Sequence, residues 1–221
     1  MRRVVTLTGI ALIVVFCSAP AHATLVNSLP GGTVVPMPDH GGVPSAFSHG
    51  PEVFGPGITW SSTNVDNQGG AVFGYTGDYS FIGNGLWTGL LGPMAGLNDS
   101  KQDYGVVDSM TFAFSTPLSG VGGFINYAPG SGNPTTIAVY DSSHNPLESF
   151  DLTFTTGGAF NSGQFFGFQR DSADISYFTL SDNYVGITNL TVAGGAVPEP
   201  GTLMLFGAGI AGLAARRRRA Q

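Results

Sequence analysis

Apolar and polar side chains alternate along much of the chain between residues 109 and 192. In residues 109–115 the apolar positions are Met110, Phe112 and Phe114, with serine, threonine or alanine between them. Successive side chains of a β-strand point to opposite faces, so this alternation predicts a strand with one buried face. Similar alternation predicts strands in residues 135–140, 150–154, 166–168, 175–180 and 185–192, and shorter runs predict strands in residues 58–65, 71–75 and 79–82.

Short strands that follow one another at intervals of about ten residues are typical of all-β sandwiches and barrels. We therefore expect residues 58–195 to form an all-β domain, a jelly-roll-like β-sandwich of about eight to ten strands. In residues 185–192 the apolar positions shift from odd to even numbers, which predicts a β-bulge near Asn189. Residues 24–57 contain six prolines and many glycines, so we expect an irregular arm that adds one edge strand.

The first 23 residues have a different pattern, without alternation. Arg2 and Arg3 precede the apolar run 4–16, and Ala21 and Ala23 form a small-residue cleavage pattern. These are the features of a secretory signal peptide, so we expect a signal helix that is removed by cleavage after Ala23.

The last 26 residues also lack alternation. Residues 202–215 carry no charge and would form a helix about 21 Å long, shorter than the roughly 30 Å hydrocarbon core of a bilayer. The basic run that follows resists translocation and should remain cytoplasmic. It consists of Arg216, Arg217, Arg218 and Arg219. On the other side of the apolar run, two prolines disfavour helix and leave an exposed, extended segment of Val197, Pro198, Glu199 and Pro200.

This order of a Val-Pro-Glu-Pro motif, a short hydrophobic helix and a basic stop in residues 196–221 resembles the PEP-CTERM sorting tail of exported bacterial proteins. The resemblance implies recognition and cleavage by an exosortase, with Val197–Pro200 as the sorting motif and Arg216–Arg219 as the membrane stop. An uncut membrane anchor and a buried core helix are the alternatives.

The segments 138–141, 167–168 and 187–190 loosely resemble the galactose-binding-like jelly-roll domains that such proteins often carry. Thr188 stands where that family usually has an acidic residue, so an ion site shared with the family is not implied.

The two ends contain most of the basic residues. Only Lys101 and Arg170 of the eight Lys and Arg lie in residues 24–197, together with thirteen of the fourteen acids, so the mature body has a net charge near −11. Nucleic-acid binding is excluded because it requires clustered Lys and Arg. The single cysteine, Cys17, lies in the signal peptide, so the body has no disulfide.

No reaction motif is present: there is no G-x-S-x-G, no H-E-x-x-H, no P-loop and no dinucleotide fingerprint. The histidines of the body, His40, His49 and His144, lie in turn-like sequence and are interpreted as solvated turn residues. We therefore expect a protein that is not an enzyme and has no cofactor.

Two loops hold carboxylates that could bind a structural calcium ion, which prefers six to eight oxygen ligands. Plain turn formation by these residues is the alternative interpretation. The candidate ligands are Asp99, Asp103, Asp171 and Asp174.

Trp60 and Trp87 are the first and last of several aromatic residues within 28 positions. Exposed indole faces could form a platform for sugar rings, whereas aromatic residues on short strands more often belong to the core. Both interpretations remain open from the sequence.

Taken together, these patterns predict an exported, non-enzymatic protein of a Gram-negative bacterium. Its partners would be the secretion machinery, an exosortase and transiently the inner membrane, and its destination the cell surface or the extracellular polysaccharide matrix of a biofilm. A secreted carbohydrate-binding module is the main alternative. An ice-binding protein and a secreted hydrolase rank lower; Thr153 and Thr155 form only an isolated Thr-x-Thr pair.

Overall fold

The computed structural model describes residues 23–42, 45–65, 70–98, 107–130, 134–181 and 184–194. The signal helix and the C-terminal hydrophobic helix that we expect lie outside these residues. The described chain is almost entirely β, with fourteen strands and two short 3₁₀-helices, η1 (Ile82–Asn84) and η2 (Gly89–Leu91). The strands are β1 (Ala23–Val26), β2 (Thr33–Val34), β3 (Glu52–Phe54), β4 (Ile58–Ser62), β5 (Ala71–Tyr75), β6 (Tyr79–Ser80), β7 (Leu86–Trp87), β8 (Met94–Leu97), β9 (Ser109–Tyr127), β10 (Thr136–Tyr140), β11 (Pro146–Asp151), β12 (Gln164–Arg170), β13 (Ile175–Ser181) and β14 (Val185–Gly194).

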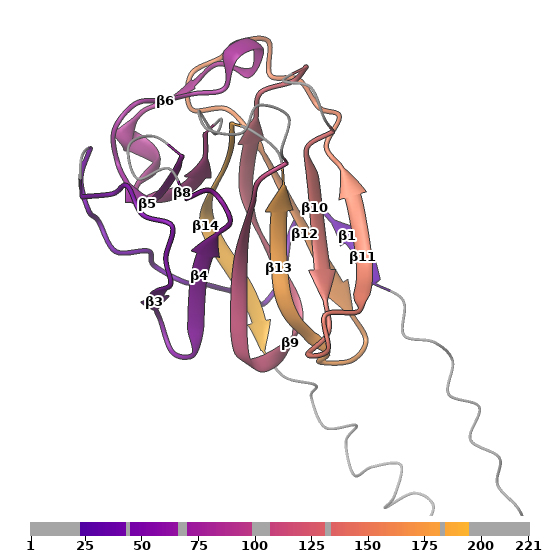
Figure 1. The fold of residues 1–221 in the computed structure, drawn as a ribbon. Helices are drawn as coiled ribbons and strands as arrows, with labels where there is room; N and C mark the ends of the chain where they lie inside the picture. The colour runs from indigo at the N-terminus through magenta and orange to yellow at the C-terminus, as the bar shows by residue number, and fades with distance from the viewer. Residues whose placement is uncertain are drawn as a thin grey trace, which may run out of the picture.

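Twelve of the strands form two layers that share the long strand β9 (Figure 1). The first half of β9 pairs with β4 and β13, and these continue into β3 on one side and into β10 and β11 on the other. We call this layer the front sheet. The second half of β9 pairs with β12 and β14, which continue into β1 and into β2, β8 and β5. We call this layer the back sheet, and together the layers form the expected all-β sandwich.

The strand β9 changes layers around Pro117. Its register with β13 shifts between Ala113 and Leu118, and Ser115 and Thr116 between them are exposed. Proline has no N–H to give to a ladder and is found in strands at edges and irregularities. The bend at Pro117 therefore joins the two sheets at one end of the sandwich, the lower end in Figure 1.

Both ends of the described chain lie at this same end of the sandwich, which we call the foot. Gly194 pairs with Leu118 next to the bend, and Ala23 pairs with Arg170 on β12. Because β1, β12, β9 and β14 are consecutive in the back sheet, three strand spacings of about 4.8 Å place the two ends about 14 Å apart.

The space between the sheets is filled by the apolar positions that alternation predicts. Met110, Phe112 and Phe114 are all buried, whereas the intervening Thr111 and Ala113 are partly exposed. The predicted bulge near Asn189 is confirmed: the register of β14 with β9 shifts between Thr188 and Thr191.

The number of strands exceeds the expected eight to ten because several strands are only two to four residues long, too short for a periodic pattern. Three of them, β1, β2 and β3, fall in residues 24–57, where we expected one edge strand. They pair with β12, β14 and β4. The unpaired backbone N–H and C=O groups of these strands can form hydrogen bonds with short extended segments that lie between prolines. The proline-rich arm is thus largely part of the sandwich.

Residues 79–92 cover the outer face of the back sheet, and we call them the cap. Tyr79, Phe81 and Trp87 pack there against Val72 and Met94 as a second hydrophobic cluster. Trp87 stacks on Phe124 of β9, with ring centroids 5.8 Å apart. The Tyr79 hydroxyl donates to the backbone oxygen of Leu97, and burial raises the pKa of this tyrosine well above its usual value.

Two buried asparagines connect the cap to residues 152–163. Asn126 of β9 donates to the backbone oxygens of Asn84 and Ser162, both at 3.0 Å. Asn84 in turn accepts the Thr156 N–H on its side-chain oxygen at 3.0 Å. These bonds satisfy polar groups that would otherwise be costly to bury.

The cap fits because the sheet beneath it has glycine at Gly186. A Cβ there would lie 2.9 Å from Met94 Cε, 2.9 Å from Phe81 Cζ and 3.1 Å from Trp87 Cζ3. We expect Gly186→Val to lower the free energy of unfolding by about 1–3 kcal/mol, because overpacking forces neighbouring side chains to move. Urea unfolding measures the change.

The control for this prediction is Gly194→Ala on the same strand, where an added Cβ has no atom within 4 Å. Its unfolding midpoint should stay close to that of the unchanged protein. Equal midpoints for Gly186→Val and Gly194→Ala would show that the cap does not press on β14.

No helix in the described residues is long and apolar enough to cross a membrane.

Candidate functional site

The two tryptophans that could have formed a sugar platform are both buried. Trp60 is 0% exposed and stacks on Phe73 with ring centroids 5.0 Å apart. Trp87 is 1% exposed and donates its indole N–H to the backbone oxygen of Ser162 at 2.6 Å. The platform prediction is therefore wrong for both residues, because Trp60 points between the sheets and Trp87 points from the cap onto the back sheet.

Of the four candidate calcium ligands, Asp99 and Asp103 lie outside the described residues. Asp171 and Asp174 lie in the turn between β12 and β13, at the foot. Both carboxylate oxygens of Asp174 accept hydrogen bonds from Arg170, with Nη2 to Oδ2 at 2.7 Å. A cation at Asp174 would have to displace this guanidinium, so the structure favours an ion pair there.

No group of three or more His, Cys, Asp or Glu residues that could hold a metal ion is found in the part of the chain that the structure describes. Calcium binding remains a prediction for Asp99, Asp103 and Asp171.

Asp39 and His40 hold the N-terminal arm against β5. The Asp39 carboxylate accepts the Gly41 N–H at 2.8 Å and the Thr76 hydroxyl at 3.1 Å, and the His40 N–H donates to the backbone oxygen of Gly74. This pair has the role of turn residues, as the sequence indicates.

His144 does more than occupy a turn, because its ring stacks on Tyr177 of β13 with centroids 4.0 Å apart and planes at 26°. It has a positive φ of 61°, in a turn that the Asp141 carboxylate stabilises. That carboxylate accepts the Asn145 side-chain and backbone N–H groups, both at 2.9 Å, and the Ser143 N–H at 2.8 Å. These bonds, first the one from the Asn145 side chain, hold the pKa of Asp141 below its usual value.

The stacked pair borders a shallow hollow of about 220 Å³ on the outer face of the front sheet. Thr111 of β9 and Thr179 of β13 form its floor and share a hydrogen bond between their hydroxyl oxygens at 3.0 Å. The residues that line this hollow are Ser109, Thr111, Tyr140, His144, Tyr177 and Thr179. None of them is Asp, Glu, Lys or Arg, and five of the six carry a hydroxyl. We call it the front-face hollow.

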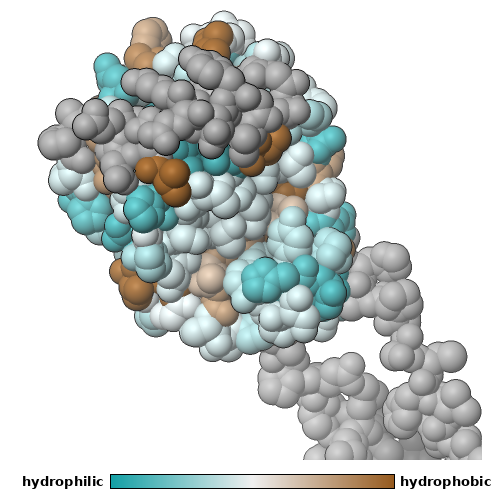
Figure 2. Space-filling model, in the orientation of Figure 1, coloured by the Kyte–Doolittle hydropathy of each residue, from teal (hydrophilic) through white to brown (hydrophobic). Residues whose placement is uncertain are grey.

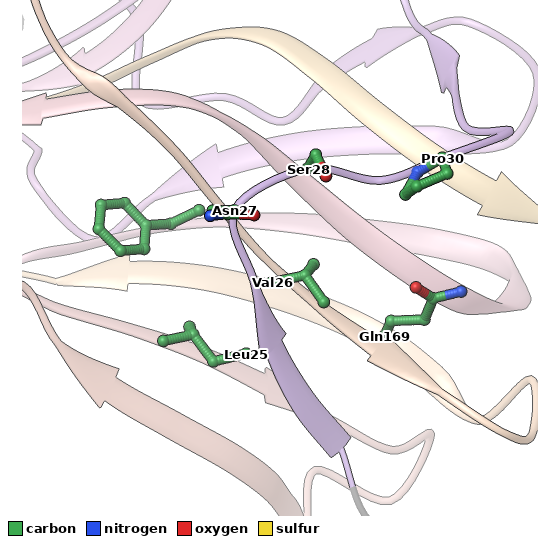
Figure 3. Close-up of a pocket in the computed structure, with 7 residues that line it drawn as sticks. Leu25, Val26, Asn27, Ser28, Pro30 and Gln169 are labelled. Carbon is green, nitrogen blue, oxygen red and sulfur yellow. The ribbon is translucent and has the colours of Figure 1, made fainter.

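A larger hollow of about 500 Å³ lies where the chain leaves β1 and passes beside β12 (Figure 3). Its lining residues are Leu25, Val26, Asn27, Ser28, Pro30, Phe166 and Gln169. Among the described residues, its lining includes no Asp, Glu, His, Lys or Arg.

The comparison with protein families concerns the segment that follows β14. Residues 196–219 match the family model of the PEP-CTERM protein-sorting motif. The chain carries a PEP-CTERM sorting motif. The match contains Val197–Pro200, the apolar run and Arg216–Arg219, as the sequence resemblance indicates.

The PEP-CTERM motif identifies an exported protein that an exosortase sorts at the membrane and that then becomes extracellular. No curated protein and no solved structure matches this chain.

The functional features thus fall into two groups. The sorting motif is visible in the sequence because its parts are contiguous. The front-face hollow is not, because it combines residues from β9, β10, β13 and the turn 141–145. The only sequence signal for it is that Tyr140, Tyr177 and Thr179 occupy the polar positions of alternating strands.

Proposed function

We propose that the mature protein is a non-enzymatic β-sandwich that is tethered to the inner membrane, cleaved by an exosortase and delivered to the cell surface or the extracellular polysaccharide matrix. The observation that carries the proposal is the position of the two chain ends. The expected signal peptide ends at Ala23 and the sorting tail follows Gly194, and both residues lie at the foot.

A membrane-tethered intermediate with this geometry has a defined orientation. Seven residues lie between Gly194 and Thr202, where the apolar run begins, so the distance from Gly194 to Thr202 is at most about 28 Å when the chain is extended. The foot would face the membrane, and the cap and the loops at the other end would face away from it.

The foot has the composition of a surface that stays in water. Its turns at residues 55–57, 115–117 and 171–174 consist of glycine, proline, alanine, small hydroxyl residues and aspartate. Such a surface would not enter the bilayer, so the tail alone would hold the intermediate.

The absence of an activity is part of the proposal. Reaction motifs are absent from the sequence. In the described residues, His40 stabilises a turn and His144 stacks on the ring of Tyr177. The net charge near −11 favours solubility of a protein released from the cell and opposes binding to anionic polymers.

The proposal is tested by following the protein with an epitope inserted between Gly157 and Gly158, which are exposed in a turn far from the foot. We expect a precursor in the membrane fraction and a shorter form outside the cell. With Glu199→Ala only the precursor should remain, because the exosortase would no longer recognise the motif.

Glu148→Ala, the same change on β11, is the matched control and should leave processing intact. A protein that stays in the cytoplasm, or a shorter form that persists with Glu199→Ala, would contradict the proposal.

A further inference from the structure

The outer face of the front sheet carries hydroxyl groups at most of its outward positions. Residues paired across neighbouring strands point to the same face, so the register defines rows that cross the sheet. One row crosses β4, β9, β13, β10 and β11 through Ser61, Thr111, Thr179, Ala138 and Ser149. The rows on either side are Val53, Thr59, Ala113, Tyr177, Tyr140 and Pro146, and Ser109, Ser181, Thr136 and Asp151.

Asp151, at the edge of the sheet, is the only charged residue in these three rows. Only 10% of the residues of the whole chain are charged, so the scarcity of charge on this face follows the composition of the chain, and the hydroxyl groups are what distinguish the face. Figure 2 looks onto this side of the molecule, where the surface is mostly pale to teal with separate small brown areas.

The outer face of the back sheet provides an internal comparison. It is covered by the cap, and its outward residues Val72, Met94 and Phe124 are apolar or pack against apolar side chains. In the described residues, no comparable segment lies over Thr111, Thr179 and Tyr177, which remain partly exposed. The two outer faces thus differ in chemistry, and the front one is suited to a polar partner.

The front-face hollow combines the two kinds of group that hold a sugar ring. The Tyr140, Tyr177 and His144 rings provide apolar faces, and the Ser109, Thr111 and Thr179 hydroxyls can both donate and accept hydrogen bonds. Pockets that enclose drug-sized ligands measure about 300–1,000 Å³. The front-face hollow, about 220 Å³, suits a single ring resting on the surface.

The charge of the hollow and of the body favours the binding of neutral polysaccharides over that of polyanions. Among the described residues, no lysine or arginine lines the hollow, so none of them can form a bidentate or lysine ion pair with a carboxylate, sulfate or phosphate group there. A body with net charge near −11 also repels polyanions. Neutral polysaccharides offer hydroxyl groups to the threonines and apolar ring faces to the aromatic side chains, with no opposing charge.

We propose that the front-face hollow binds one ring of a neutral polysaccharide, with Tyr177 and His144 as the stacking pair and Thr111 and Thr179 as hydrogen-bonding residues. The inference adds a ligand class to the matrix destination proposed above. It does not depend on how the protein is exported.

The test uses the full chain, purified in detergent so that both apolar ends are retained and processing is irrelevant. An array of neutral glucans, mannans and galactans is compared with the polyanion alginate. We expect binding to at least one neutral polysaccharide through the hollow, whereas any binding to alginate should come from the Arg216–Arg219 run of the full chain and should be unchanged by substitutions in the hollow. Dissociation constants are then measured for variants by affinity electrophoresis in gels that contain the bound polysaccharide.

We expect Tyr177→Ala to weaken binding at least about tenfold, because the aromatic side of the hollow is removed and the His144 ring loses the ring on which it stacks. Tyr177→Phe should bind nearly as well as the unchanged protein. Thr111→Val and Thr179→Val, which keep the side-chain shape, should each weaken binding about fivefold. Ser149→Ala, on the same face but outside the hollow, is the matched control and should have no effect.

Folding of each variant is checked by its urea midpoint, since all four positions are partly or fully exposed at the surface. Lack of binding to any neutral polysaccharide, alginate binding that a folded Tyr177→Ala protein loses, or unchanged binding of the neutral polysaccharide by that variant would each overturn the inference. Glu199→Ala, which blocks processing, should bind normally, so failure of this inference is distinguishable from failure of the proposed export route.

Discussion

Replacing Trp60 by alanine is expected to lower the free energy of unfolding by about 3–5 kcal/mol. The indole is fully buried between the sheets, where it stacks on Phe73 and lies on β4 opposite Phe112 of β9. Removing it leaves a cavity at the point where strands from both sheets meet. Domains of this kind are stable by only about 5–15 kcal/mol, so a large part of the stability would be lost.

The variant Trp60→Phe distinguishes the contribution of the aromatic ring to stability from that of the indole N–H. The Trp60 Nε1 atom is buried without a hydrogen-bond partner, and an unsatisfied buried donor costs about 1–3 kcal/mol. Phenylalanine keeps a ring for stacking and removes this donor, so we expect the variant to lie within about 1.5 kcal/mol of the unchanged protein.

Urea unfolding followed by the fluorescence of Trp87, the other tryptophan, measures both variants of Trp60. An alanine variant as stable as the unchanged protein would show that Trp60 is not a core residue and would reopen its interpretation as an exposed platform.

Deleting Gly195 and Ala196 is expected to leave most of the exported protein in its uncleaved form. Four residues lead from Gly194, the last residue of β14, to Pro198, so the sorting motif lies within about 14 Å of the sandwich. The front sheet alone is six strands wide, about 24 Å. With a shorter connection, the folded sandwich would collide with the exosortase before the sorting motif reached the site of cleavage.

Two control variants isolate the length of this connection. Replacing Gly195 and Ala196 by two serines keeps the length and should preserve cleavage. Inserting Gly-Ser-Gly-Ser after Gly195 should preserve or increase it. The ratio of cleaved to uncleaved protein is read from the epitope-tagged chain, and normal cleavage of the deletion variant would show that the enzyme does not meet a folded sandwich.

Much of the sandwich is predictable from the sequence because its central strands bury one face. Met110, Phe112 and Phe114 alternate with polar residues in the chain and are buried in the structure. The bulge at Asn189 is likewise predictable, since an extra residue moves the later apolar side chains to the opposite parity. These features depend on neighbours in sequence.

Other features depend on pairing between distant segments. Trp87 is buried by the cap on Phe124, which is far from it in the chain, so periodicity alone cannot separate a core residue from a sugar platform. The hollow at Tyr177 requires the turn that holds His144 and the pairing of β9 with β13. The strands β1, β2 and β3 are too short to have a periodic pattern of their own. They form because the strands beside them have unpaired backbone N–H and C=O groups, which the sequence does not reveal.

The central position of β14 has a consequence for the order of folding during export. This strand is the last element before the tail, yet it lies between β9 and β8 and joins the two halves of the back sheet. A chain that crosses the membrane N-terminus first cannot complete that sheet until Gly194 has emerged. Eight residues later the apolar run begins. The sandwich therefore closes only when the tail is about to enter the bilayer, so secretion delivers a chain that becomes folded and tethered at nearly the same moment.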